Sequence, residues 1–110
     1  MSAPKMAFGY VPPKEWLIKF AKARNLIQED PKTSRERAEA MQEAVYQILT
    51  EADLWGSAEA ILVDINDMPM YCIALATNWD DKQPTHGQVN RLKAILNINN
   101  EPSWRYTYSQ

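Results

Sequence analysis

Residues 60–77, with the sequence AILVDINDMPMYCIALAT, decide the fold of this chain. Two apolar runs of strand length, 60–65 and 71–77, lie on either side of the turn-forming residues 66–69. β-Branched and other apolar residues in two short runs, separated by a turn cluster, predict a β-hairpin.

Neither face of this hairpin is polar. Because alternate strand residues share a face, Ile61, Val63 and Ile65 are expected on the same side of the first strand. The opposite faces carry apolar or small residues, among them Ala74 and Ala76. We therefore expect both faces to be covered at least in part, and the small side chains would let a helix lie close to the backbone.

Three helices are expected around the hairpin. The first begins at Pro12-Pro13, a residue type suited to the first helical turn, and is expected to end near Gln28, before Pro31. The second and third begin at capping boxes, in which a threonine and a residue three positions later satisfy exposed backbone N–H groups. These boxes are Thr33 with Glu36 and Thr85 with Gln88. The second helix is expected to stop at Gly56, and the third over residues 97–100.

A hairpin alone is marginal in water, so further strands are expected. Two terminal segments alternate suitably, one containing Met6, Phe8 and Tyr10 and the other covering residues 104–108. We expect at least the second to join the sheet. The prediction is a single α+β domain over residues 1–110, with three helices, a small, mainly antiparallel sheet and the element order (β)ααββαβ.

The composition is that of a globular protein, with 45% hydrophobic residues. Its single cysteine, Cys72, lies in an apolar run and is expected to be a buried, inert thiol. The N-terminal residues lack the apolar segment of a signal peptide, and no apolar stretch reaches the roughly 18 residues of a membrane span. We therefore expect a soluble, cytoplasmic protein with no membrane partner. A pI near 5.3 argues against nucleic acid as a partner.

Residues that commonly carry catalysis are sparse. A hydrolytic triad would have to use His86, the only histidine, and one histidine with one cysteine cannot form the usual structural zinc site. Gly9, Gly56 and Gly87 are too scattered for a phosphate-binding loop. We therefore predict no catalytic residue, no metal site and no cofactor.

Aspartates near the hairpin leave one alternative open. Asp80-Asp81-Lys82 places a carboxylate two residues before a lysine, with Asp64 upstream. This distantly resembles the acid-plus-acid-x-lysine pattern of restriction-type nucleases, although here the pair lies in a loop before Pro84 and not in a strand. The resemblance implies carboxylates that hold a metal while the lysine orients a water. The alternative function is a small, nuclease-like, metal-dependent hydrolase using Asp64, Asp80 and Asp81.

Charge is sorted along the chain. Residues 1–37 carry eight Lys and Arg against four Asp and Glu, and residues 82–110 carry four against one. Residues 38–81 contain nine Asp and Glu and no Lys or Arg. The net charge of −2 hides this acidic middle between two basic ends. Such asymmetry is an argument about association and steering, not about fold.

Aromatic residues gather toward the C-terminus. Tyrosine, tryptophan and arginine are enriched at binding hot spots, so the candidate binding residues are Trp79, Trp104, Arg105, Tyr106 and Tyr108. The competing interpretation is that residues 104–108 simply form the inward face of the last strand. Trp16 and Trp55 are interpreted as core residues or helix-end contacts.

These patterns favour a non-catalytic protein-interaction domain that forms a homodimer or binds a partner protein. The edges of a small sheet would add a template for pairing with another chain. Besides the hydrolase, a second alternative is a small-molecule or glycan-binding module that uses Trp79 and Trp104 as an aromatic floor.

Overall fold

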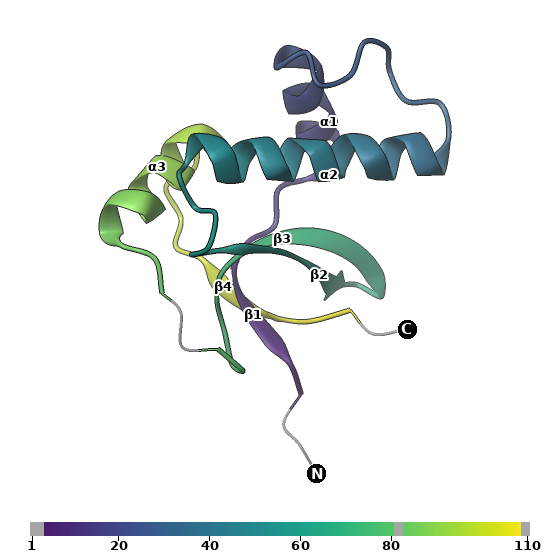
Figure 1. Cartoon of the computed structure of the whole chain (residues 1–110). Coiled ribbons are helices and arrows are strands. Elements are labelled where there is room, and N and C mark those ends of the chain that lie inside the picture. Colours follow the sequence, from purple (N-terminus) through teal and green to yellow (C-terminus); the bar gives the residue numbers. More distant parts are fainter. Residues whose placement is uncertain (1–3, 81–82, 109–110) are drawn as a thin grey trace.

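A computed structural model describes residues 4–80 and 83–108 of the chain (Figure 1). Its elements, in chain order, are β1 (Met6–Tyr10), α1 (Lys14–Ala23), α2 (Ser34–Glu51), β2 (Glu59–Ile65), β3 (Met68–Thr77), α3 (His86–Leu96) and β4 (Ser103–Tyr106). This confirms the α+β class and the predicted order, with the N-terminal strand present. The last strand is shorter than predicted.

The four strands form one antiparallel sheet in the order β2-β3-β1-β4. The predicted hairpin is β2 and β3, in which Ile65 pairs with Met68. Asn66 and Asp67 between them have φ of 54° and 65°. Two consecutive left-handed residues are what a tight two-residue hairpin turn needs, because their twist matches that of the strands. The turn is thus shorter than the expected four residues, and Pro69 belongs to β3.

All three helices end at a left-handed residue that is not glycine. Asn25, Asp53 and Asn97 have φ between 54° and 59°, and the short polar side chains of Asn and Asp tolerate this conformation. At the end of α2 the backbone N–H of Leu54 donates to the Leu49 carbonyl at 2.8 Å, which is typical of a Schellman motif. The predicted stops at Gln28 and Gly56 were therefore too late, because Asn25 and Asp53 end α1 and α2 first.

The helices lie on one side of the strongly bent sheet (Figure 1). Their buried side chains meet those of the sheet in the main core, which includes large residues from the first two helices, from β3 and from α3. Its fully buried large members include Leu17, Ile48, Leu49, Ile73 and Leu92. Both capping boxes are present at the starts of α2 and α3, as predicted.

The other face of the sheet has a second, smaller core of Ala7, Val63, Cys72 and Ala74. After β4 the chain returns to β2. There Thr107 bridges to Val63, and the backbone N–H of Tyr108 donates to the Leu62 carbonyl at 2.9 Å. The sheet thereby curls over its own inner face. Cover on both faces was predicted, but the expectation of a helix beside Ala74 was wrong, because the cover on that side comes from strands.

Close packing of β1 on β3 depends on Gly9. The strand register shifts between Phe8 and Gly9, and a Cβ atom at position 9 would collide with the carbonyl oxygen of Ile73. Only glycine allows this approach without a backbone shift. Among the helices of the described residues, none is long and apolar enough to cross a membrane.

Candidate functional site

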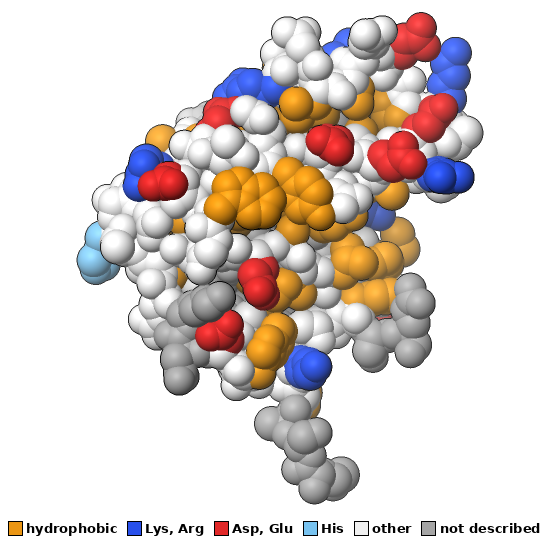
Figure 2. Space-filling view, viewed as in Figure 1, with side chains coloured by type: hydrophobic (Ala, Val, Ile, Leu, Met, Phe, Trp, Pro, Cys, Tyr) orange, Lys and Arg blue, Asp and Glu red, His pale blue; other side chains and the backbone are white. Residues whose placement is uncertain are grey.

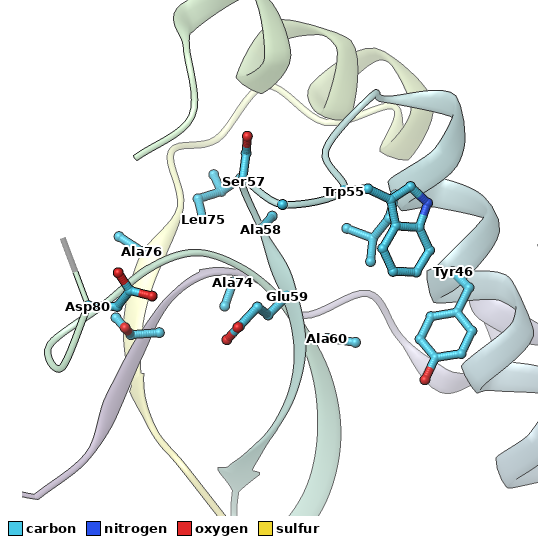
Figure 3. Close-up of a pocket in the computed structure, with 13 residues that line it drawn as sticks. Tyr46, Trp55, Ser57, Ala58, Glu59, Ala60, Ala74, Leu75, Ala76 and Asp80 are labelled. Carbon is cyan, nitrogen blue, oxygen red and sulfur yellow. The ribbon is translucent and has the colours of Figure 1, made fainter. Parts of the chain in front are cut away.

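A notch interrupts the sheet edge because β3 continues beyond the start of β2. Ala74 of β3 pairs with Glu59, the first residue of β2, and Thr77 pairs with Asp80, where the chain folds back. Three strand steps separate Ala74 from Thr77, or about 10 Å. Between these pairings no described strand lies beside Leu75 on that edge. The resulting hollow has a volume of about 390 Å³ and is flanked by Glu59 and Asp80 (Figure 3).

Tyr46 and Trp55 line the hollow on its α2 side, and the Glu59 carboxylate points away from their rings (Figure 3). Their ring centroids lie 5.6 Å apart and the ring planes are inclined by 46°. Tyr46 is 37% exposed and Trp55 is 56% exposed. The two rings therefore present a joint aromatic surface to solvent.

Hydrogen bonds hold this aromatic wall in place. Gln42 Nε2 donates to the Tyr46 hydroxyl at 2.7 Å, and Trp55 Nε1 donates to Thr50 Oγ1 at 2.8 Å. Thr50 in turn donates its hydroxyl proton to the Tyr46 carbonyl at 3.0 Å. Because Gln42, Tyr46 and Thr50 are spaced four residues apart, they lie on one face of α2. The rings are exposed, yet a hydrogen bond at the polar end of each one fixes its orientation.

Small residues form the floor of the notch. They are Gly56, Ala58, Ala60, Ala74 and Ala76. Thr77 also lines the hollow, and its Oγ1 atom is buried without a hydrogen-bond partner in the described part of the chain. A buried hydroxyl without a partner carries a desolvation cost.

The electrostatic character of the notch is acidic. Glu59 and Asp80 are its charged lining residues, and no Lys, Arg or His is among the described residues that line it. Glu59 is exposed, and none of the ion pairs formed between described residues involves it. In Figure 2, which shows the face over the junction of α2 and β2, exposed hydrophobic side chains have acidic side chains above and below them.

Other carboxylates of the acidic middle stretch are paired with cations from the basic ends. Arg24, at the end of α1, donates two hydrogen bonds to Glu51, at 2.8 and 2.9 Å. Arg91 Nη2 lies 4.0 Å from Asp53 Oδ2. The bonds from Arg24 hold the pKa of Glu51 below its usual value, against the opposing effect of partial burial. The charge segregation seen along the sequence is thus partly neutralised in space.

The candidate residue Trp79 directly precedes Asp80 in the chain. It is 46% exposed, and the Lys5 ammonium lies 5.6 Å from its ring centroid. Trp104, in contrast, contacts Phe8, with ring centroids 5.1 Å apart. The two tryptophans of the proposed glycan floor therefore have different neighbours, and no ring contact between them occurs in the described residues.

The candidates on β4 point away from the core. Trp104 and Tyr106 are 46% and 58% exposed, Arg105 is exposed, and Tyr108 is half-buried beyond the strand. The interpretation of residues 104–108 as an inward face is therefore wrong for Trp104 and Tyr106. They form a second aromatic surface, which Phe8 of the neighbouring strand extends.

The aspartates of the hydrolase alternative do not converge. Asp64 pairs with Pro69 at one end of β3, whereas Asp80 pairs with Thr77 at the other. Asp64 accepts a hydrogen bond from the backbone N–H of Asp67 at 2.8 Å, as a turn aspartate commonly does. Asp81 lies outside the described residues. Within the described ranges no group of three or more His, Cys, Asp or Glu could hold a metal ion.

The cysteine and the histidine also lie apart. Cys72 is buried in the inner face of the curled sheet, and this burial raises the pKa of its thiol to about 12. His86 is exposed in the first turn of α3. The structure therefore forms no Cys–His pair of the kind that activates a nucleophile.

Sequence reasoning missed the residues that build the notch. Trp55 was interpreted as a core or helix-end residue; it does contact the end of α2 through Thr50, but more than half of it is exposed. The four-residue spacing of Gln42, Tyr46 and Thr50 was an available signal for an ordered exposed face. No local signal marked Glu59, because its role depends on where β2 starts relative to β3.

Comparison with protein-family models, with curated proteins and with solved structures found no match to this chain.

Proposed function

We propose that the chain is a non-catalytic protein-interaction domain, which binds a second copy of itself or a partner protein by receiving a cationic segment in the acidic notch. The observation that carries this proposal is an exposed, hydrogen-bonded aromatic pair, Tyr46 and Trp55, beside a hollow whose charged lining residues are acidic. Aromatic rings whose orientation is fixed before binding lose little conformational freedom on association.

The charge of the notch selects the occupant. An exposed cation–π contact contributes about 0.5–1 kcal/mol, and an exposed ion pair contributes about 0.2–1 kcal/mol. These energies are too small to give a stable complex alone, so the notch serves mainly for orientation and selectivity. Affinity would come from neighbouring apolar surface, for which the exposed rings of Trp79, Trp104 and Tyr106 are the candidates.

Self-association is one form of this proposal. Lys19 on α1 and Arg105 on β4 are exposed and belong to the basic ends of the chain, while Glu59 belongs to the acidic middle. Two copies could therefore meet basic against acidic. Fields between exposed charges fade beyond about 8 Å at physiological salt, so this contact should weaken as salt is added.

The placement of the reactive groups supports binding over catalysis. The thiol of Cys72 is buried and has a raised pKa, and it lies on the opposite face of the sheet from the helices. His86 lines a different hollow from Glu59. The carboxylates that a metal-dependent hydrolase would need are separated along β3.

The test is sedimentation velocity over a range of protein concentrations at low and high salt, paired with affinity capture that uses immobilised protein as bait. We expect association or capture at low salt, weakened by Glu59→Gln, by Trp55→Ala and, to a lesser extent, by Trp104→Ala. Glu43→Gln is the matched control, because it removes an exposed carboxylate on α2 outside the notch.

Two results would contradict the proposal. One is a strict monomer that also captures no partner at low salt. The other is association or capture that Glu59→Gln and Trp55→Ala leave at the wild-type level.

A further inference from the structure

We propose that the chain carries a second binding site, a hollow beside the end of β1, which takes a monocarboxylate ligand with an apolar body. Arg105 receives the carboxylate and Trp16 receives the apolar body. The lining of this hollow shares no residue with that of the acidic notch, so the proposal goes beyond the proposed function and does not depend on it. A free small acid and the C-terminus of a polypeptide present this same chemistry.

Arg105 is the exception among the arginines of the chain. Arg24, Arg35, Arg37 and Arg91 each lie within 4.0 Å of a carboxylate oxygen. Within residues 4–80 and 83–108, the guanidinium group of Arg105 forms no ion pair and no hydrogen bond. Its five N–H donors are therefore available to an anion, and their fork matches both oxygens of a carboxylate.

The strand register places Arg105 on the inner face of the sheet. Arg105 pairs with Ala7 of the inner core and follows Trp104, which points outward. Burial raises the pKa of the Cys72 thiol, and the positive charge of Arg105 opposes this rise, as expected for a cation on the same face. Arg105 is exposed and lines the hollow together with Val11, which packs against the inner core. A ligand in the hollow can therefore reach the guanidinium group.

The walls of the hollow are held in place before any ligand binds. Trp16 of α1 is half-buried and stacks on Phe20, with ring centroids 5.3 Å apart and ring planes inclined by 21°. The Tyr10 hydroxyl donates to the Asn100 carbonyl at 2.9 Å, which ties the loop after α3 to the end of β1. The hollow has a volume of about 460 Å³, within the roughly 300–1,000 Å³ that is usual for small-ligand sites.

The lining favours an acid that carries an apolar body. Apolar surface is supplied beside Arg105 by Val11, Pro12, Trp16 and Ile98. Mostly apolar walls with a few polar groups are typical of ligand sites, in which the polar groups fix the orientation of the ligand. The indole N–H of Trp16 has no hydrogen-bond partner in the described part of the chain, so it is a second donor on the lining.

The charge balance of the hollow limits the ligand to one negative charge. Arg105 and Glu101 are the charged residues of its described lining. Lys93 Nζ lies 3.1 Å from Glu101 Oε1, so the Glu101 carboxylate already has a cationic partner. A dianion such as a phosphate monoester would find a single guanidinium group and a nearby carboxylate. A monocarboxylate, in contrast, is matched by one guanidinium group.

Four probes test the proposal. They are phenylacetate, phenylacetamide, and the peptide acetyl-Gly-Gly-Phe with either a free or an amidated C-terminus. Each probe is titrated into ¹⁵N-labelled full-length protein at low salt, and the Trp16 indole N–H and the backbone signals of residues 97–103 are followed by NMR. We expect both acids to bind with a millimolar Kd, and each amide to bind at least about three-fold more weakly than its acid. The tighter acid identifies the source, a free small acid or a chain terminus.

Variants of Arg105 locate the binding. Arg105→Gln is expected to weaken both acids by about three-fold or more and to leave the amides unchanged. Arg105→Lys keeps the charge but loses the fork, so an intermediate affinity is expected. Arg35→Gln is the matched control, because it removes an exposed arginine of α2 outside the hollow. Since both positions are exposed, folded variants are expected, and their amide spectra away from the hollow verify this.

Three results would overturn the proposal. The first is that neither acid shifts the signals of the hollow. The second is that the amides bind as tightly as the acids. The third is acid binding that Arg105→Gln leaves at the wild-type level. None of these results bears on the notch, whose role is decided by the sedimentation and capture experiments with Glu59→Gln and Trp55→Ala.

Discussion

The two faces of the sheet are both buried but are covered in different ways. Three helices cover one face, and its core includes large side chains such as Ile73 and Leu49. The other face is covered by the curl of the sheet itself, and its buried core contains Ala7, Val63, Cys72 and Ala74. A separate layer of helices leaves room for large residues, whereas a sheet that bends over its own inner face leaves room for small ones. We infer that the first face supplies most of the stability and that the second sets the curvature.

Truncation of the helix-covered core should have the largest effect. Leu49→Ala and Ile73→Ala are each expected to lower the free energy of unfolding by about 2–5 kcal/mol, since both side chains are fully buried and neither cavity can collapse freely. Leu62→Ala is the control; Leu62 is 40% exposed, and its loss should cost under about 1 kcal/mol. Urea denaturation measures all three. Unchanged stability in either buried variant would remove that residue from the core.

Substitution of Gly9 should disturb both faces at once, because β1 contributes to each. Gly9→Ala forces a Cβ atom against the Ile73 carbonyl, and we expect a loss of about 3 kcal/mol from the backbone shift that follows. Gly87→Ala is the matched control. A Cβ atom at position 87 would meet nothing closer than 3.8 Å, and alanine in a helix is favoured by about 0.5–1 kcal/mol. Thermal unfolding of the pair should therefore shift in opposite directions.

Enlargement of the inner face tests whether its small residues set the curl. Ala7→Leu is expected to cost about 1–3 kcal/mol, because Ala7 is fully buried in the inner core and the closed sheet has no room for the added atoms there. The backbone amide of Tyr108, bonded to Leu62 across the closure, should also exchange with solvent faster. Hydrogen exchange that is unchanged at Tyr108 in a folded variant would show that the inner core does not control the closure.

The last effect concerns the Cys72 thiol and is absent at neutral pH. Its pKa of about 12 in the folded state lies above the value of about 8.5 expected in the unfolded chain. The stabilisation linked to the protonated thiol is therefore fully present below about pH 8.5 and is lost as the pH rises toward 12. Burial also raises the pKa values of Tyr10 and Tyr71, so these groups add to the pH dependence of stability. Comparison with Cys72→Ala isolates the contribution of the thiol, because both tyrosines are present in both proteins. Rapid reaction of the native thiol with a disulfide reagent at pH 8 would contradict the burial.

Local patterns predicted the elements well and their arrangement only in part. The hairpin and both capping boxes follow from residues within a few positions of one another, such as Thr33 and Glu36. The way in which strands cover the inner face of the sheet could not be predicted from local patterns. It requires Thr107 to pair with Val63, which is far away in the sequence. The helix-end prediction at Gly56 was wrong because an aspartate, Asp53, adopted the left-handed conformation first.

The candidate site was less predictable than the fold. The exposed aromatics of β4 were identified from residue type alone, and their outward direction could not be deduced from the alternation of Trp104 and Tyr106. The notch joins an α2 face, the loop that carries Trp55 and the two ends of an interrupted strand edge. Glu59 and Asp80 are neighbours only because β2 starts at one position and the chain folds back at another.

Closure of the sheet between β4 and β2 has a consequence for the order in which the protein can fold. Among the described residues, Thr107 and Tyr108 pair with the outer edge of β2, and both follow all the other elements along the chain. Until these two residues are made, a nascent chain carries an unpaired strand edge, which can template pairing with a neighbouring chain. We therefore expect the residues that complete the native sheet also to reduce pairing between newly made chains.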